Sequence, residues 1–357
     1  MEAGPLAPAQ SDSLPPGTIR AAFELDPVDV DTLLRRASGP ADDPTGGRFV
    51  AEHDGRVTVD FPAVNWGRSA ALLLSAIVAG EAMELAVFSR CRLVDLRLPD
   101  GLLPGPRFGA AGIAPRDQGA AASLGVIVKP PLGLAAADVA RAVGAAVAGG
   151  ADLVKDDEIL GDPPSCPLYE RVAAVATVLD DGTIYCPNVT GPSATLLERA
   201  RRVVELGATG VMLAPFAQGL DALIALRDAD LGVPIYAHRA GSGPLARSAR
   251  FGATSAVLAQ LVRLCGADWV AAGGFGGSLF DGDDEVRASI DAIRGPCGRA
   301  PAAIPVVGGA LTPDGVAEQA RRAGGAPLLV MLGSGAYAHP GGLEAGVRAA
   351  AAALRAA

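Results

Sequence analysis

The chain contains only two lysines, Lys129 and Lys155, although it carries 28 arginines. Each lysine directly follows a short apolar run, residues 124–128 and residues 152–154. Lysine, unlike arginine, can lose its proton and then serve as a base, a Schiff-base nucleophile or a carbamate precursor. Two lysines at the ends of two predicted strands therefore indicate that both take part in a reaction. The alternative is that both were retained by chance.

The strongest local motif is Lys155-Asp156-Asp157-Glu158. Alternate residues of a strand share a face, so Lys155 and Asp157 can point together, and Glu158 can join them where the strand gives way to a loop. A carbamate on the lysine would add a third oxygen ligand to the two carboxylates, which suits Mg²⁺. The alternative is an exposed acidic turn with an ion pair that contributes little to stability.

From residue 124 onward, short apolar strands alternate with Ala-rich helical stretches. This pattern predicts a (β/α)8 barrel, whose typical size is ~250 residues. The rival is an open doubly wound sheet, which usually carries a glycine-rich fingerprint at its first turn, and none is present there. The predicted strands are 124–128, 152–154, 183–187, 210–213, 234–237, 269–272, 304–307 and 327–332, with helices at 135–148, 194–206, 252–264, 285–294 and 313–323.

Barrel enzymes keep their active sites at the carboxyl ends of the strands. Nearly all polar and glycine-rich segments of this half fall on that rim, so we expect the site there. These segments are Lys129, Lys155 to Glu158, Asn188, His238-Arg239, residues 273–278, Gly308-Gly309 and Gly333-Ser334-Gly335.

The first third of the chain predicts a smaller α+β unit. Its strands are expected at 18–25, 48–53, 56–61 and 91–98 and its helices at 29–37 and 65–79, with a hairpin turn at Asp54-Gly55. We expect a disordered leader over 1–16, an α+β domain over 17–110 and a barrel domain over 119–357. The Pro/Gly-rich segment 99–118 is the expected connector.

The composition limits which partners the protein is expected to bind and in which compartment it is expected to occur. The net charge is −9 and no basic stretch interrupts it, which argues against nucleic acid. The longest apolar stretch, residues 70–79, is too short to span a bilayer, and the N-terminus lacks the pattern of a signal peptide. The five cysteines are scattered without a paired spacing, so we expect reduced thiols and a cytoplasmic location.

Two motifs, residues 125–134 (GVIVKPPLGL) and 149–158 (GGADLVKDDE), resemble the RuBisCO large-subunit superfamily. The segment 94–99, the pair His238-Arg239 and the later glycine motifs, with His339-Pro340 after them, fall in the family's order. The resemblance covers residues 56–342. It implies a C-terminal (β/α)8 TIM barrel with a smaller N-terminal α+β domain of ferredoxin-like fold.

The resemblance also implies roles for individual residues. Lys155 would be the carbamylated lysine, which uses CO2, and Asp157 and Glu158 would be the other Mg²⁺ ligands. Lys129 would handle the substrate proton at enolisation, and His238 would contact substrate oxygens. Arg239 would contact the distal end of the substrate, and the phosphate would lie against Gly308, Gly309, Gly333, Ser334 and Gly335.

Departures from the family's pattern imply a RuBisCO-like protein of form IV that is not a true carboxylase. Ser278 stands where carboxylating members have a lysine, and Ala271 replaces a phosphate-binding histidine. Val307 replaces a serine and Ile127 a threonine. In the N-terminal domain Glu81 aligns with an asparagine that contacts substrate, and it could act as a second acid or base.

These observations leave four functions open. The leading one is an Mg²⁺-dependent isomerase or enolase of a phosphorylated keto-sugar or thio-sugar without CO2 fixation. The alternatives are a decarboxylase of a phosphorylated β-keto sugar acid, a Schiff-base aldolase and a non-catalytic phosphosugar-binding protein. The resemblance implies a homodimer, or an assembly of dimers, in which the N-terminal domain of one subunit covers the barrel mouth of its partner.

Overall fold

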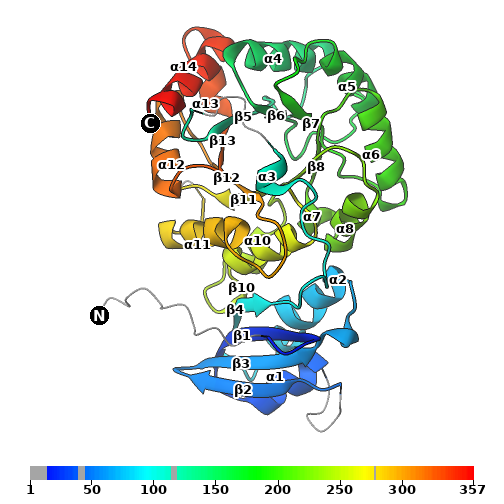
Figure 1. Ribbon diagram of the computed structural model, residues 1–357, viewed down its shortest axis with the longest axis vertical. Helices are drawn as coiled ribbons and strands as arrows, with labels where there is room; N and C mark the ends of the chain where they lie inside the picture. The colour runs from blue at the N-terminus through cyan, green and yellow to red at the C-terminus, as the bar shows by residue number, and fades with distance from the viewer. Residues whose placement is uncertain (1–13, 39–44, 114–118, 277–278) are drawn as a thin grey trace.

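The computed structural model describes residues 14–38, 45–113, 119–276 and 279–357, which form an eight-stranded parallel sheet and a separate five-stranded sheet (Figure 1). All eight strands predicted from the sequence are confirmed. They are β5 (Ser123–Ile127), β6 (Leu153–Lys155), β7 (Ile184–Cys186), β8 (Val211–Leu213), β9 (Ile235–Ala237), β11 (Trp269–Gly273), β12 (Ile304–Gly308) and β13 (Leu329–Leu332).

The parallel sheet closes into a barrel. Its strands follow the order β7-β6-β5-β13-β12-β11-β9-β8, and a parallel bridge between Asn188 and Met212 joins the two end strands. The Met212 amide donates to the Pro187 carbonyl at 2.9 Å along this seam. The alternative of an open doubly wound sheet is therefore wrong.

Helices surround the barrel in a ring (Figure 1). Each turns an apolar stripe toward the strands, because the outward side chains of a parallel barrel must also be buried. The helices are α4 (Ala136–Gly149), α5 (Leu168–Ala176), α6 (Leu196–Glu205), α8 (Leu220–Asp228), α10 (Ser255–Leu264), α11 (Asp283–Arg294), α12 (Val316–Ala323) and α14 (Gly342–Ala356), with short turns α7 (Pro215–Gln218), α9 (Gly243–Ala246) and α13 (Ser334–Tyr337) between them.

The connector between the two halves covers the amino-terminal end of the barrel. Its short helix α3 (Gly109–Gly112) lies across the centre of the ring in Figure 1. The buried Asp268 carboxylate, just before β11, accepts hydrogen bonds from the Phe108 and Gly109 amides at 2.8 Å each. With this end covered, the carboxyl ends of the strands are the face left for a site.

The five-stranded sheet has the ferredoxin-like strand order at its core, β4-β1-β3-β2. It contains β1 (Thr18–Asp26), α1 (Val30–Ser38), β2 (Arg48–His53), β3 (Arg56–Pro62) and β4 (Arg90–Arg97). The Asp29 carboxylate accepts from the Thr32 amide at 3.0 Å, which caps α1. Asp54 and Gly55 both have positive φ, the geometry of the predicted two-residue hairpin turn.

Two helix predictions were wrong in extent. The continuous helix over 65–79 is instead a short turn η1 (Ala63–Asn65), then α2 (Ala70–Leu73) and η2 (Leu74–Val78), because the Ser69 hydroxyl accepts from the Leu72 amide and starts a new helix. The helix over 252–264 starts at Ser255, because β10 (Phe251–Ala253) pairs in parallel with β4. The barrel half thus adds a fifth strand to the smaller sheet.

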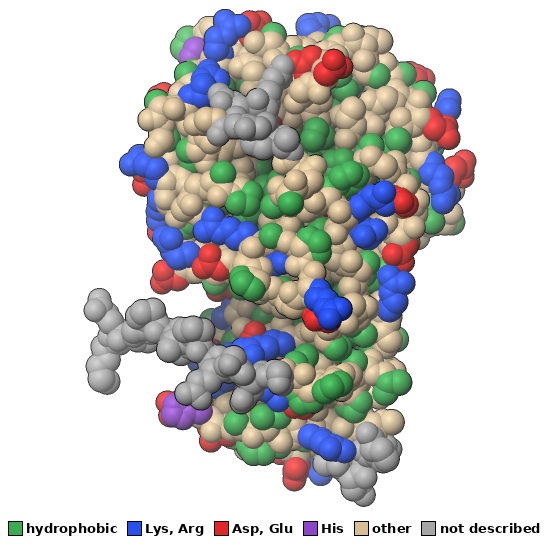
Figure 2. Space-filling view, viewed as in Figure 1, with side chains coloured by type: hydrophobic (Ala, Val, Ile, Leu, Met, Phe, Trp, Pro, Cys, Tyr) green, Lys and Arg blue, Asp and Glu red, His purple; other side chains and the backbone are tan. Residues whose placement is uncertain are grey.

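Charges on the face shown in Figure 2 are interspersed, with no continuous basic patch. Within the described ranges no helix has both the length and the hydropathy to cross a membrane. Most of the leader predicted over 1–16 lies outside the described residues.

Candidate active site

A cavity of about 450 Å³ opens at the carboxyl ends of the barrel strands. It collects most of the residues that the sequence singled out. Its lining contains Ile127, Lys129, Lys155, Glu158, Tyr236, His238, Arg239, Ala271, Gly273, Leu279, Val306, Gly308, Gly309, Ala310, Met331, Gly333 and Ser334.

Three predicted site residues lie outside this lining. Asp157 is almost fully buried beside Lys129. Gly335 packs against the Leu311 backbone, where a Cβ built on it would lie 2.0 Å from the carbonyl oxygen. Glu81, in the short turn η3 (Glu81–Glu84) of the N-terminal half, is 57% exposed and pairs with Arg36 at 3.1 Å.

Lys155 is fully buried at the end of β6. Its Nζ donates to the Asp156 carbonyl at 2.9 Å and lies 3.9 Å from Glu158 Oε2. Burial lowers the pKa of Lys155 to about 8, even though the carboxylates of Glu158 and Asp157 favour its charged form. Near physiological pH a larger fraction of this amine is therefore neutral than in a free lysine, and the neutral amine is the state that can add CO2.

Lys129 stands at the end of β5, with its side chain 27% exposed. Its Nζ contacts Asp157 Oδ2 at 2.5 Å, and its backbone amide donates to the Tyr337 hydroxyl at 3.0 Å. That hydroxyl donates in turn to the Ile127 carbonyl at 3.3 Å. Tyr337 anchors this wall from α13, and no local sequence signal pointed to it.

His238 follows β9 and is held in one tautomer. Its Nδ1 accepts from the Ala240 amide at 3.1 Å, so the proton of the neutral ring is on Nε2, which lies 3.6 Å from Glu158 Oε2. Burial lowers the pKa of His238 to about 3, and the charge of Lys155 adds to the effect. The imidazole is thus a neutral donor aimed at the carboxylate edge of the cavity.

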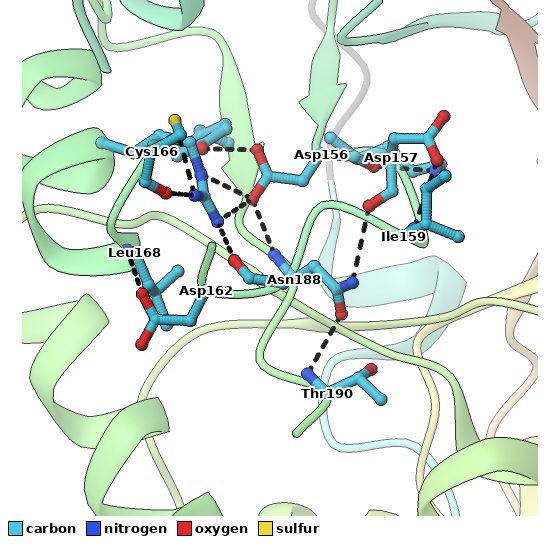
Figure 3. A network of polar contacts seen from close by, with 12 residues as sticks. Asp156, Asp157, Ile159, Asp162, Cys166, Leu168, Asn188 and Thr190 are labelled. Atoms are coloured by element: carbon cyan, nitrogen blue, oxygen red, sulfur yellow. Dashed lines mark hydrogen bonds and ion pairs between the residues drawn. The ribbon is translucent and has the colours of Figure 1, made fainter. Parts of the chain in front are cut away.

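The side chains of Asp156 and Asp157 point in opposite directions (Figure 3), and Asp156 is not part of the cavity lining. The Asp156 carboxylate accepts from Arg171 Nε and Nη2 at 3.1 and 3.0 Å and from the Tyr185 hydroxyl at 2.7 Å. It also accepts from the backbone amide of Asn188 at 3.0 Å. Burial and the Asp156 carboxylate raise the pKa of Tyr185 well above its ordinary value, so its hydroxyl remains a donor. Strand alternation turns Lys155 and Asp157 to one face and Asp156 to the other, so the sequence itself indicates that Asp156 has a different role.

This buried network positions the loop that carries Asp157 and Glu158. Arg171 donates to the Gly161 and Cys166 carbonyls at 2.8 and 2.7 Å, and Asn188 Nδ2 donates to the Glu158 carbonyl at 2.9 Å (Figure 3). The backbone on both sides of Glu158 is therefore tied to β7 and α5. Asp156 and Arg171 are positioning residues, since neither lines the cavity.

Replacing Arg171 with methionine should lower the free energy of unfolding by about 3–5 kcal/mol, because the buried Asp156 charge would lose its partner. Urea unfolding followed by circular dichroism measures the change. Arg202→Met is the matched control, since its ion pair with Glu205 is exposed and should be worth less than about 1 kcal/mol. A loss no larger than that of the control would contradict a structural role for the pair.

The glycine segments after β12 and β13 bring backbone, not side chains, to the cavity. A Cβ on Gly308 would lie 2.9 Å from the Met331 carbonyl, and Gly309 has a φ of +135° that other residues rarely adopt. Gly333 lies where a Cβ would contact Ile127 and Lys129. Close-lying backbone amides of this kind can bind an anion.

The rest of the cavity wall is largely apolar. Ile127 and Ala271 line it, whereas Val307 and Phe275 do not. Val307 is buried on the outer side of β12, where alternation turns Val306 inward instead, and Phe275 is buried with its backbone paired to Gln319. Ser278 lies outside the described residues.

Asp157 and Glu158 fit a divalent cation only if Lys155 supplies a third oxygen ligand. Among the described residues no group of three His, Cys, Asp or Glu side chains is placed to hold a metal. Asp157 and Glu158 could supply two oxygen ligands beside a buried lysine whose lowered pKa makes the neutral amine more accessible than in a free lysine. A carbamate at Lys155 would supply the third oxygen ligand and balance the charge of Mg²⁺.

A sequence model of the ribulose bisphosphate carboxylase large chain, catalytic domain, matches residues 115–357. The chain belongs to the RuBisCO large-chain family. Within this family it is a RuBisCO-like protein, similar to a ribulose bisphosphate carboxylase-like protein of Bordetella bronchiseptica that is 33% identical over 82% of this chain and 73% of its own length. A RuBisCO-like protein from Burkholderia fungorum superposes with a TM-score of 0.84 at 27% identity and covers 95% of each chain.

Several relatives in the RuBisCO family bear the names of enzymes. The 3-oxo-isoapionate-4-phosphate transcarboxylase/hydrolase of Xanthobacter autotrophicus is 35% identical over 80% of this chain and 72% of its own length. The 2,3-diketo-5-methylthiopentyl-1-phosphate enolase of Geobacillus thermodenitrificans is 34% identical over 84% of this chain and 75% of its own length. Both names describe phosphorylated substrates, and they support an enzymatic, enolase-type role for this chain.

Proposed function

We propose that this RuBisCO-like protein catalyses Mg²⁺-dependent enolisation or isomerisation of a phosphorylated keto-sugar or thio-sugar, without CO2 fixation. The observation that carries the proposal is a buried lysine of lowered pKa beside Asp157 and Glu158, facing a cavity that also contains Lys129. The relative named as an enolase supports the reaction class. The five free cysteines agree with a reducing cytoplasm.

Each polar group has a role in this reaction. Lys155 as a carbamate, Asp157 and Glu158 would hold Mg²⁺, which would polarise the substrate carbonyl. Lys129 takes the proton from the carbon next to that carbonyl and returns it elsewhere in the product. His238 donates from Nε2 to a substrate oxygen, and the backbone of the glycine segments holds the phosphate.

The second candidate is decarboxylation of a phosphorylated β-keto sugar acid. It is favoured by the relative whose name describes a 3-oxo acid phosphate as its substrate. Loss of CO2 from such an acid gives an enediolate, the same kind of species that α-proton removal gives. One site can therefore serve either reaction, and the substrate decides which bond breaks.

Proton exchange in D2O, followed by NMR on a panel of ketose monophosphates and 3-oxo acid phosphates, tests the proposal. We expect Mg²⁺-dependent exchange of the α-proton in at least one ketose phosphate, lost on removing Mg²⁺ with EDTA. CO2 release from an acid without exchange in any ketose would favour the decarboxylase. Covalent trapping by borohydride would favour a Schiff-base aldolase, and binding without turnover a non-catalytic protein.

We also propose that the site is completed in a homodimer or an assembly of dimers. Glu81 lies in the N-terminal half and is absent from the cavity lining of its own chain, so it can act only across a subunit interface. Mixing inactive Glu81→Gln with inactive Lys129→Met and allowing subunit exchange should restore activity. At full exchange half the dimers are mixed and carry one intact site of two, which gives about one quarter of the wild-type activity.

Subunit exchange itself is verified by mass spectrometry of differently tagged chains. Mixing Lys155→Met with Lys129→Met is the control, because both changes fall in the same cavity and no intact site can form. Proven exchange without recovery would remove Glu81 from the site.

A further inference from the structure

The hydroxyl oxygen of Tyr236 has no hydrogen-bond partner among the described residues, although the side chain is buried. The residue is the middle one of β9, and only 2% of it is exposed. Burying a hydroxyl without a hydrogen bond costs free energy, and most buried polar groups in folded proteins are paired. The unpaired hydroxyl of Tyr236 therefore points to a role outside the packing of the free protein.

The other three tyrosines of the chain do not share this property. Tyr185 donates to a buried carboxylate at 2.7 Å, and Tyr337 donates to a backbone carbonyl at 3.3 Å. Tyr169 is 37% exposed, so water can bind its hydroxyl. Tyr236 is thus the exception among the tyrosines.

The side chain of Tyr236 lies in an apolar layer of the barrel. Its register partners on the neighbouring strands β8 and β11 are Met212 and Trp269, and all three residues belong to one apolar cluster. Neither partner offers a strong acceptor for the hydroxyl. A phenylalanine would fill the same space without desolvating an oxygen, so packing alone does not account for the tyrosine.

The hydroxyl of Tyr236 is accessible from the active-site cavity. The residue lines that cavity, and its oxygen is not among the polar atoms of the described residues that are sealed from solvent without a partner. Tyr236 and His238 alternate along β9 and share its inward face, with their rings nearly parallel and 6.5 Å apart between centroids. Lys155 Nζ lies 5.7 Å from the centroid of the tyrosine ring. The hydroxyl therefore belongs to the end of the cavity that contains Lys155 and His238.

We infer that Tyr236 is a further catalytic residue, whose hydroxyl donates a hydrogen bond to the substrate oxygen on which negative charge develops. The inference rests on the proposed function and adds a donor to it. When Lys129 takes the α-proton, the electron pair of the broken C–H bond moves toward the carbonyl oxygen, and Tyr236 keeps its own proton throughout. Together with Nε2 of His238, the hydroxyl gives this end of the cavity two neutral donors. Donors that are fixed in place before the reaction stabilise such an oxygen more than water does.

Tyr236→Phe removes the oxygen and keeps the ring. The midpoint of thermal unfolding should stay within about 2 °C of the wild type or rise, because the hydroxyl has no partner to lose in the described part of the free protein. On the substrate identified by proton exchange, kcat should fall about 10²–10³-fold with a small change in KM, the loss typical of one oxyanion donor. Circular dichroism and steady-state kinetics measure the two effects.

Tyr185→Phe is the matched control for stability. Its hydroxyl is also buried but donates to Asp156, so the midpoint should fall by about 4 °C or more. If Tyr236→Phe lowers the midpoint as far as this control does, the hydroxyl acts in the fold and the inference is overturned. Wild-type kcat in a stable Tyr236→Phe variant also overturns it.

Calorimetric titration with two phosphorylated probes, in Mg²⁺ and bicarbonate, tests the donor without turnover. Phosphoglycolohydroxamate presents planar oxygens like those of an enediolate, whereas glycerol 3-phosphate has no such oxygens. Tyr236→Phe should bind the hydroxamate about tenfold more weakly than the wild type and glycerol 3-phosphate within about threefold of it. Equal affinities of the two proteins for the hydroxamate, equal losses for both probes, or a wild type that does not bind the hydroxamate would overturn the inference.

The proposed reaction fails separately from this inference. Absence of proton exchange in every ketose phosphate, with the hydroxamate affinities as expected, would remove the enolisation and leave Tyr236 as a donor to an oxyanion formed in another way.

Discussion

Replacing Lys155 with arginine should abolish α-proton exchange, lowering kcat by about a thousandfold or more, because loss of metal assistance removes several kcal/mol of transition-state stabilisation. Arginine keeps the positive charge but cannot form the carbamate. NMR exchange assays at saturating Mg²⁺ and bicarbonate measure the effect. Lys155→Met, which lacks the positive charge as well as the amine, should be equally inactive. Equal losses in the two variants would mean that the positive charge alone does not sustain activity.

Activation of the wild type should rise with pH through about 8, the pKa to which burial lowers Lys155. Below that pH the folded protein keeps the amine charged, and a charged amine does not add CO2. Between about 8 and 10.5 the folded state has released a proton that the unfolded chain retains, so the free energy of unfolding also rises with pH there. Full activity in CO2-free buffer after EDTA treatment would contradict the carbamate.

The second large effect is expected at Lys129. Changing it to methionine should lower kcat about 10²–10⁴-fold with a small change in KM, because proton transfer is lost while the phosphate contacts remain. Steady-state kinetics on the substrate found by exchange provide the measurement.

Lys129 could transfer the substrate proton, or it could act only through its positive charge beside Asp157. Lys129→Arg distinguishes these two roles. Arginine preserves a positive charge beside Asp157 but cannot take up a proton. If Lys129 transfers the proton, Lys129→Arg should be as inactive as Lys129→Met. Near-normal activity in Lys129→Arg would mean that the lysine acts only through its charge.

The sequence was sufficient for those parts of the molecule that depend on local periodicity. The eight barrel strands were predicted because each is a short apolar run before a helical period, and the shared face of Lys155 and Asp157 follows from strand alternation. The gathering of Lys129, His238 and the glycine segments at one cavity followed from barrel topology, since all of them follow strand ends.

The missed features are contacts between residues remote in sequence. Tyr337 binds the backbone of Lys129 from 208 positions away, and Arg171 reaches Asp156 from the next helix. Asp281 was indistinguishable from the other acidic residues around α11 until the fold placed it against Arg239. Strand β10 was missed because it forms by pairing with β4, which is far away along the chain.

The placement of β10 limits how this chain can be divided. The Cys91 amide donates to the Arg250 carbonyl at 2.8 Å and the Thr254 amide to the Leu93 carbonyl at 3.0 Å, so the outer edge of β4 is satisfied by a segment from the other half of the chain. An excised N-terminal half would expose that edge, with its unpaired amides and carbonyls, to solvent. Exposed strand edges of this kind recruit further strands, so the isolated piece should aggregate where the intact chain does not.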